Sequence, residues 1–105
     1  MISVNIRKLY LSHNYLERLE GIECFRELTH LSVSFNRLRF IEDFGMVSET
    51  LEHLTVKGNY FIEKNPDHKS ILVRQFPHLK ELDSEPVQRQ NLADAAALRK
   101  LFLTS

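Results

Sequence analysis

Apolar and polar residues alternate in three short segments of the chain, and an asparagine follows each of them. The segments are residues 6–16 (IRKLYLSHNYL), 28–38 (LTHLSVSFNRL) and 51–61 (LEHLTVKGNYF). Each fits the pattern L-x-x-L-x-L-x-x-N-x-L when other apolar residues are accepted for leucine. A period of two residues is typical of a strand with one buried face. The pattern therefore predicts three short strands, one in each segment.

The three segments recur at a nearly constant spacing, which indicates a repeat architecture. The step is 22 residues from Asn14 to Asn36 and 23 residues from Asn36 to Asn59. We expect the strands of successive repeats to lie parallel, about 4.8 Å apart. Each asparagine lies where the chain turns out of its strand. Because an amide side chain both donates and accepts hydrogen bonds, it can satisfy the backbone of its own turn and of the next repeat.

The segments between the strands change to a period of three. Apolar residues recur at every third position from Leu16 to Leu31 and again from Leu38 to Val47. This period is typical of 3₁₀ turns, in which side chains three residues apart eclipse. The extra residue of the second repeat is expected in a loop or short helix around residues 48–50, and Glu42 and Asp43 in a solvated loop.

The C-terminal part of the chain carries different signals. Residues 65–67 (Asn-Pro-Asp) predict a helix with Asn65 as N-cap, ending at Pro77. Residues 79–82 predict a last edge strand, with Glu81 directed inward and protecting the edge. Residues 84–105 predict a helix with an apolar stripe, which either packs on the end of the repeats, as we favour, or binds a partner.

These motifs resemble the intracellular leucine-rich repeat family with 22-residue units, over residues 6–87. That family ends in a cap, and the matching positions here are Gly58-Asn59, Pro66, Leu72-Val73, Phe76-Pro77-x-Leu79-x-x-Leu82-Asp83 and Val87. Tyr60, His68 and Lys69 depart from the family pattern. The resemblance implies an α/β fold, namely a short right-handed horseshoe solenoid with its parallel sheet on the concave face. It also implies structural roles for Leu82 and Asp83 beside the three asparagines.

The predicted domain organisation follows these boundaries. Residues 1–83 form the repeats and their cap, with repeats at about 6–27, 28–50 and 51–75 and a cap strand at 76–83, and residues 84–105 form the C-terminal helix. The repeats begin at Ile6 without an N-terminal capping helix. The exposed edge of the first repeat could therefore pair with a second copy and form a homodimer.

Strand alternation places a second set of side chains on the concave, solvent-facing side of the sheet. Two columns are expected, one of Lys8, His30 and His53, the other of Tyr10, Ser32 and Thr55, and alignment of the cap adds His78 to the first and Lys80 to the second. The predicted partner-binding residues are Lys8, Tyr10, Ser12, His30, Ser32, Ser34, His53, Thr55, Lys57, His78 and Lys80. No carboxylate is expected in either column, so the face should suit an acidic or helical peptide.

The histidine column admits three interpretations. It is an exposed polar ladder without a special role, a pH-sensitive contact because histidine titrates near neutrality, or a zinc site. The zinc site is the least favoured, because no cysteine or acid is expected nearby and Lys8 would repel a cation. We therefore expect no metal and no cofactor. The sequence also contains no catalytic motif, so we expect no enzyme.

Composition narrows the class of function. The chain has 105 residues, with 14 Lys and Arg against 14 Asp and Glu, so its formal net charge is zero and direct nucleic-acid binding is not expected. No apolar run approaches the ~18 residues that span a bilayer. The single cysteine, the lack of a secretory signal and the family resemblance favour an intracellular protein, cytoplasmic or nuclear.

The predicted function is a non-catalytic protein–protein interaction module or scaffold that binds another protein through its concave face. Relatives in the family leave two alternatives open. One is a subunit of an RNA–protein assembly of the spliceosomal type. The other is a regulatory or cytoskeletal adaptor, related to a phosphatase, dynein, tubulin or the centrosome. The fold cannot choose among these functions.

Overall fold

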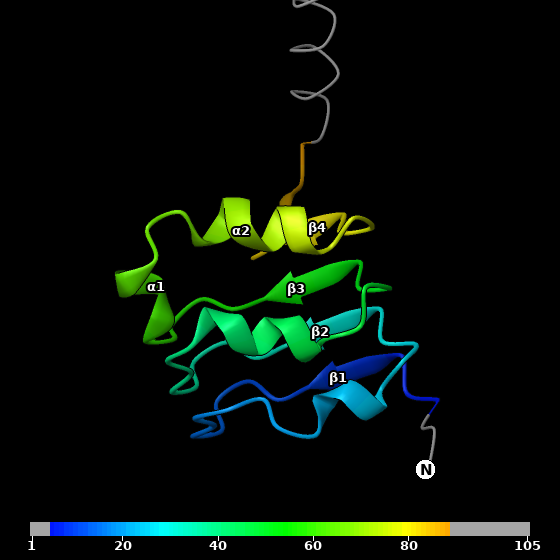
Figure 1. Ribbon diagram of the computed structural model, residues 1–105, viewed down its shortest axis with the longest axis horizontal. Coiled ribbons are helices and arrows are strands. Elements are labelled where there is room, and N and C mark those ends of the chain that lie inside the picture. The colour runs from blue at the N-terminus through cyan, green and yellow to red at the C-terminus, as the bar shows by residue number, and fades with distance from the viewer. Residues whose placement is uncertain (1–4, 89–105) are drawn as a thin grey trace, which may run out of the picture.

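Figure 1 shows the protein as a computed structural model, which describes residues 5–88. One sheet contains the strands in sequence order: β1 (Lys8–Tyr10), β2 (His30–Ser32), β3 (His53–Thr55), β4 (Glu81–Leu82) and β5 (Glu85–Pro86). The first four strands are parallel, and β5 turns back antiparallel to β4. The chain is thus mixed α/β, with each of the three predicted strands at its expected place.

Short helical segments connect the strands on one side of the sheet (Figure 1). The first two are 3₁₀ helices, η1 (Ile22–Cys24) and η2 (Ile41–Met46). Two α-helices follow β3, α1 (Phe61–Lys64) and α2 (His68–Gln75). The three-residue period of the sequence therefore predicted the helix type correctly, because it brings apolar side chains to one edge of a 3₁₀ turn. Within residues 5–88, the structure has no helix that combines the length and the apolar character needed to cross a membrane.

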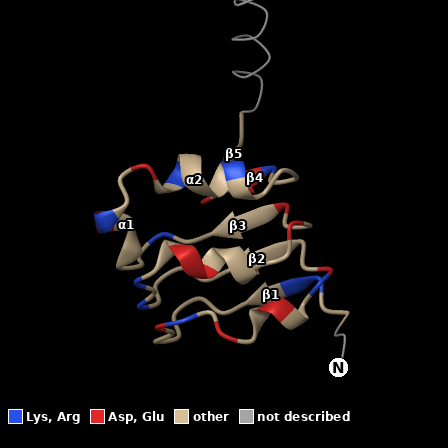
Figure 2. Ribbon diagram, viewed as in Figure 1, with Lys and Arg blue, Asp and Glu red and all other residues tan. Residues whose placement is uncertain are grey.

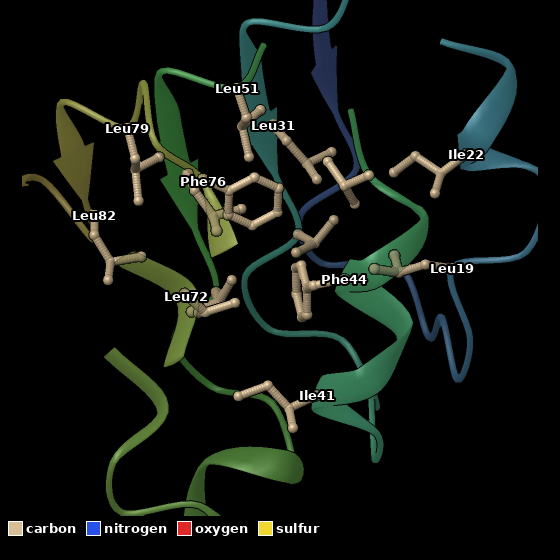
Figure 3. Close-up of a cluster of buried hydrophobic side chains, with 14 of the residues drawn as sticks. Leu19, Ile22, Leu31, Ile41, Phe44, Leu51, Leu72, Phe76, Leu79 and Leu82 are labelled. Carbon is tan, nitrogen blue, oxygen red and sulfur yellow. The ribbon is translucent and has the colours of Figure 1, made fainter. Parts of the chain in front are cut away.

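The hydrophobic core lies between the sheet and the helical segments. Leu31 and Leu54 point into it from β2 and β3, and Phe44, Leu72 and Phe76 point into it from η2 and the region of α2 (Figure 3). These five side chains are 0–2 % exposed. No single repeat could bury such side chains alone, so each repeat is stabilised by its neighbours.

The asparagines form a ladder of hydrogen bonds across the repeats. Asn36 Oδ1 accepts bonds from the backbone N–H groups of Asn14 and Leu16, both at 3.0 Å, and its Nδ2 donates to the carbonyls of Leu11 and Val33, both at 2.9 Å. Asn59 acts in the same way one repeat later, with Leu38 N–H and the Val33 carbonyl. This confirms the predicted alignment of the asparagines, of which Asn36 and Asn59 are buried and Asn14 is exposed.

An acid continues the polar ladder at the C-terminal end of the sheet. Asp83 Oδ1 accepts hydrogen bonds from the backbone N–H groups of Val56, at 2.7 Å, and Lys57, at 3.2 Å. Leu82 is 4 % exposed and lies opposite Leu54. Both residues thus make contacts that support the last strand, β4.

The expected solvated loop at Glu42 and Asp43 is wrong for Asp43. Its carboxylate is 5 % exposed and accepts two hydrogen bonds from the Arg18 guanidinium, at 2.8 and 2.9 Å, and a longer one from Leu19 N–H. The hydrogen bond from Arg18 holds the pKa of Asp43 below its usual value against the opposing effect of burial. The pair joins the first repeat to the second.

Two predictions for the C-terminal part need correction. Helix α2 begins at His68, with Asp67 as N-cap, because the Asn65 side chain instead donates to the Phe61 carbonyl and ends α1. The helix does end before Pro77, as predicted. Residues 84–88 are not helical, because Glu85–Pro86 pairs with β4 as strand β5. The rest of the predicted C-terminal helix lies outside the described residues.

Candidate functional site

One face of the sheet carries the polar side chains that alternate with the buried leucines. Lys8, His30 and His53 lie opposite one another in register, and so do Tyr10, Ser32 and Thr55. Tyr10 is 67 % exposed. We call this surface the sheet face and define it by Lys8, Tyr10, Ser12, His30, Ser32, His53, Thr55, Lys57 and Glu81. The strands therefore bring together the first three members of both predicted columns.

The two histidines of the sheet face stack on each other. The rings of His30 and His53 lie 4.2 Å apart between centroids, at 20° between planes, and His30 Nδ1 is 2.9 Å from the Thr29 hydroxyl. Desolvation lowers the pKa of His30, and the positive charges of His53 and Lys8 lower it further. A neutral His30 is thus favoured in the folded protein.

The hydroxyl groups beside the histidines are bonded to one another. Ser12 Oγ and Ser32 Oγ share a hydrogen bond, and Thr55 Oγ1 donates to Ser32 Oγ at 2.8 Å. This network crosses three repeats. It fixes the rotamers of the side chains and so gives the sheet face a defined shape.

The last position of the histidine column is Glu81, where His78 was predicted. Glu81 lies opposite His53, and its Oε2 is 3.8 Å from His53 Nδ1. The expectation that no carboxylate enters the columns is therefore wrong. Leu79 and Leu82 have the same spacing as Leu51 and Leu54, and this signal in the sequence places Glu81 opposite His53.

His78 and Lys80 lie outside the columns, where the chain enters the strands. They line an open hollow of about 740 Å³ together with Arg7, Glu27 and Glu52. Lys80 Nζ is 2.9 Å from Glu52 Oε1, and its hydrogen bond lowers the pKa of Glu52. Because this pair is neutral, Lys80 adds little positive charge to the sheet face.

Ser34 is also misplaced by the alternation rule. It is 5 % exposed, because the strand ends at Ser32 and the chain then turns toward the buried Asn36. Its Oγ has no hydrogen-bond partner among the described residues. Ser34 therefore cannot contact a partner on the surface as it stands.

The structure offers no support for a zinc site at the histidines. Within residues 5–88, no group of three or more His, Cys, Asp or Glu side chains is arranged to hold a metal ion. The closest arrangement on the sheet face is His30, His53 and Glu81, in which the 3.8 Å contact from His53 to Glu81 is an ion-pair distance.

Protonation of His30 should destabilise the fold. Its pKa in the folded state lies below the value of about 6.5 for an unfolded chain, so the unfolded chain binds the proton more tightly. Stability is thus full above about pH 6.5 and is lost as the pH falls toward the folded pKa. Urea unfolding between about pH 7 and about pH 5 should show a smaller loss for His30→Gln than for the wild type. The control His78→Gln should follow the wild type, and parallel curves for all three proteins would contradict the assignment.

Two comparisons with known proteins agree with this geometry. The family described as Leucine Rich Repeat matches residues 5–26, which contain β1 and η1. The chain is also 24 % identical over 116 aligned positions to leucine-rich repeat-containing protein 23 of Bos taurus. The match covers 88 % of this chain and 34 % of the bovine protein, so the chain spans about a third of that relative. Both findings, together with the stacked parallel strands, support a leucine-rich repeat protein.

Proposed function

We propose that this chain is a non-catalytic module that binds a partner protein through the sheet face. Leucine-rich repeat domains generally mediate protein–protein interaction and are typically not enzymes. The observation that carries the proposal is the row formed by exposed Tyr10 and the stacked pair of His30 and His53. Tyrosine is a frequent anchor at interfaces, and prearranged side chains lose little entropy on binding.

The charges of the sheet face favour a partner of mixed polarity. Lys8 is the cationic end of the histidine column and Glu81 is its anionic end. A partner segment that crosses the strands should therefore place an acidic group near β1 and a basic group near β4. Such complementary charges select the orientation of a partner more than they increase its affinity.

We further propose that the repeats wind as a short right-handed solenoid of the 22-residue class, with the sheet face as its concave surface and the segment after β3 as its cap. The parallel strands in sequence order and the helical segments on one side support this arrangement. Right-handed connections between parallel strands are strongly preferred. The hydrogen bonds of Asp83 to the turn after β3 support the cap.

Quantitative affinity capture from cell extract tests the proposed function. Tyr10→Ala and His53→Ala should each reduce the amount of the specifically captured proteins, with a loss of affinity of roughly tenfold. The matched control is Glu42→Ala, since Glu42 is exposed on η2, across the core from the sheet face. Thermal unfolding of each variant checks that the fold is kept.

Equal capture by wild type and both sheet-face variants would overturn the proposal. A captured set that disappears after ribonuclease treatment would instead favour the alternative of a subunit in an RNA–protein assembly.

A further inference from the structure

Exposed aromatic rings follow the points where the chain leaves the strands. Tyr15 is 79 % exposed, Phe35 47 % and Tyr60 48 %. Register places Tyr15 beside residue 37 and residue 37 beside Tyr60, and backbone bonds from Arg37 N to Leu16 O and from Phe61 N to Leu38 O hold these turns together. The rings therefore form one surface across three repeats, and such grouped exposure often marks an interaction site.

The backbone holds Phe35 in an unusual conformation. His13, Phe35 and Gly58 occupy the same turn position in successive repeats, and all have positive φ, at 61°, 56° and 79°. Phe35 stacks on His13, with 4.7 Å between ring centroids. A Cβ at residue 58 would lie 2.5 Å from Phe35 Cδ1, so only glycine leaves room for the ring. A bulky residue with positive φ is strained, and such strain is often found at functional sites.

Three cations lie over these rings. Arg37 is 4.6 Å from the centroid of Tyr15, Arg39 is 5.7 Å from that of Tyr60, and Lys57 Nζ is 5.7 Å from that of Phe35. The part of the chain that the structure describes provides no carboxylate within 4.0 Å of these three cations, although Glu17 and Glu63 are near in sequence. Figure 2 shows the basic segments in the loops beyond β2 and β3, on the side where α1 lies.

We propose that this surface is a second docking site, which binds an acidic segment of a partner protein that also carries apolar side chains. We call it the exit strip and define it by Tyr15, Phe35, Arg37, Arg39, Lys57 and Tyr60. An arginine stacked on a ring keeps its guanidinium edge free to bind a carboxylate through two hydrogen bonds. The exposed rings supply apolar contact area between these charges.

Nucleic acid fits the exit strip less well than an acidic protein segment. Bases also stack on aromatic rings, but nucleic-acid binding rests mainly on many phosphate contacts. The exit strip has three cations, and the net charge of the whole chain is zero. The three cations match a short acidic segment, whereas a nucleic acid would leave most of its phosphates without a partner.

Titration of the isotopically labelled full chain, followed by NMR, tests the proposal. The probe is a short peptide rich in glutamate and phenylalanine, compared with a matched peptide that has lysine for glutamate and with single-stranded RNA. The glutamate peptide should shift the amides of residues 13–15, 35–39 and 58–60 in a saturable way, more strongly at low salt. Arg37→Gln combined with Arg39→Gln should weaken binding roughly tenfold or more.

The control is Arg74→Gln, because Arg74 is exposed on α2 and lies outside both surfaces. It should bind the glutamate peptide as the wild type does. The proposal is overturned if the glutamate peptide gives no saturable shifts at these amides, if RNA or the lysine peptide binds more tightly, or if Arg74→Gln and the double variant lose equal affinity. The sheet face enters none of these readouts, so this test and the capture experiment can fail separately.

Discussion

Asn36→Ala should lower the free energy of unfolding by about 3 to 5 kcal/mol, because it leaves several buried backbone groups without a partner. The Asn36 side chain accepts from two N–H groups of the first repeat and donates to carbonyls of both repeats. Alanine can replace none of these bonds, and Asn36 is 4 % exposed, so water cannot replace them without opening the turn. Urea unfolding followed by circular dichroism measures the loss.

Asn14→Ala is the matched control for the ladder. Asn14 is exposed, and its side chain donates only to the Leu11 and Ser12 carbonyls of its own turn. Its loss should cost about 1 kcal/mol or less, because water can reach these carbonyls. Equal losses for Asn14→Ala and Asn36→Ala would show that the bonds between repeats contribute nothing beyond the local turn.

Phe44→Ala should destabilise the protein by about 3 to 5 kcal/mol, by removing buried apolar area and leaving a cavity. The Phe44 ring is 0 % exposed, meets Phe61 edge to face with 5.5 Å between centroids, and lies where η2 contacts α2. The Phe44 carbonyl accepts a 2.6 Å hydrogen bond from Gln75 Nε2, which the substitution leaves in place. Because small domains have a total stability of about 5–15 kcal/mol, a large part of it would be lost.

Phe40→Ala separates core packing from helix propensity. Phe40 precedes η2 in the same segment but is 45 % exposed, with Arg18 over its ring at 4.7 Å. Its replacement should cost roughly 1 kcal/mol or less, in line with a surface position. If the urea midpoints of Phe40→Ala and Phe44→Ala fell together, the assignment of Phe44 to the main core would be wrong.

Sequence reasoning located the strands and helical turns because their signals are local. The period of two around Leu31 and Leu54 and the period of three through Leu38 and Phe44 each require only neighbouring residues. The constant step between asparagines then places one repeat on the next. This is why the order of the strands and the alignment of Asn36 with Asn59 could be predicted.

Errors arose where the repeat ends. The position of His78 was taken from the alignment of the cap as a whole, whereas the spacing of Leu79 and Leu82 sets the register and places Glu81 opposite His53. Ser34 follows the alternation of a strand that already stops at Ser32. Alternation predicts the exposure of a side chain only while the backbone stays extended.

By itself, the sequence determined the pattern of repeats, the side of each strand that is buried and the residues that share a column, because all of these follow from spacing along the chain. Tertiary structure alone decided which surface side chains meet. The burial of Asp43 depends on Arg18, 25 residues away, and the stack of Arg37 on Tyr15 joins two repeats. Such contacts depend on the register and rotamers of neighbouring repeats, which no local pattern of polar and apolar residues specifies.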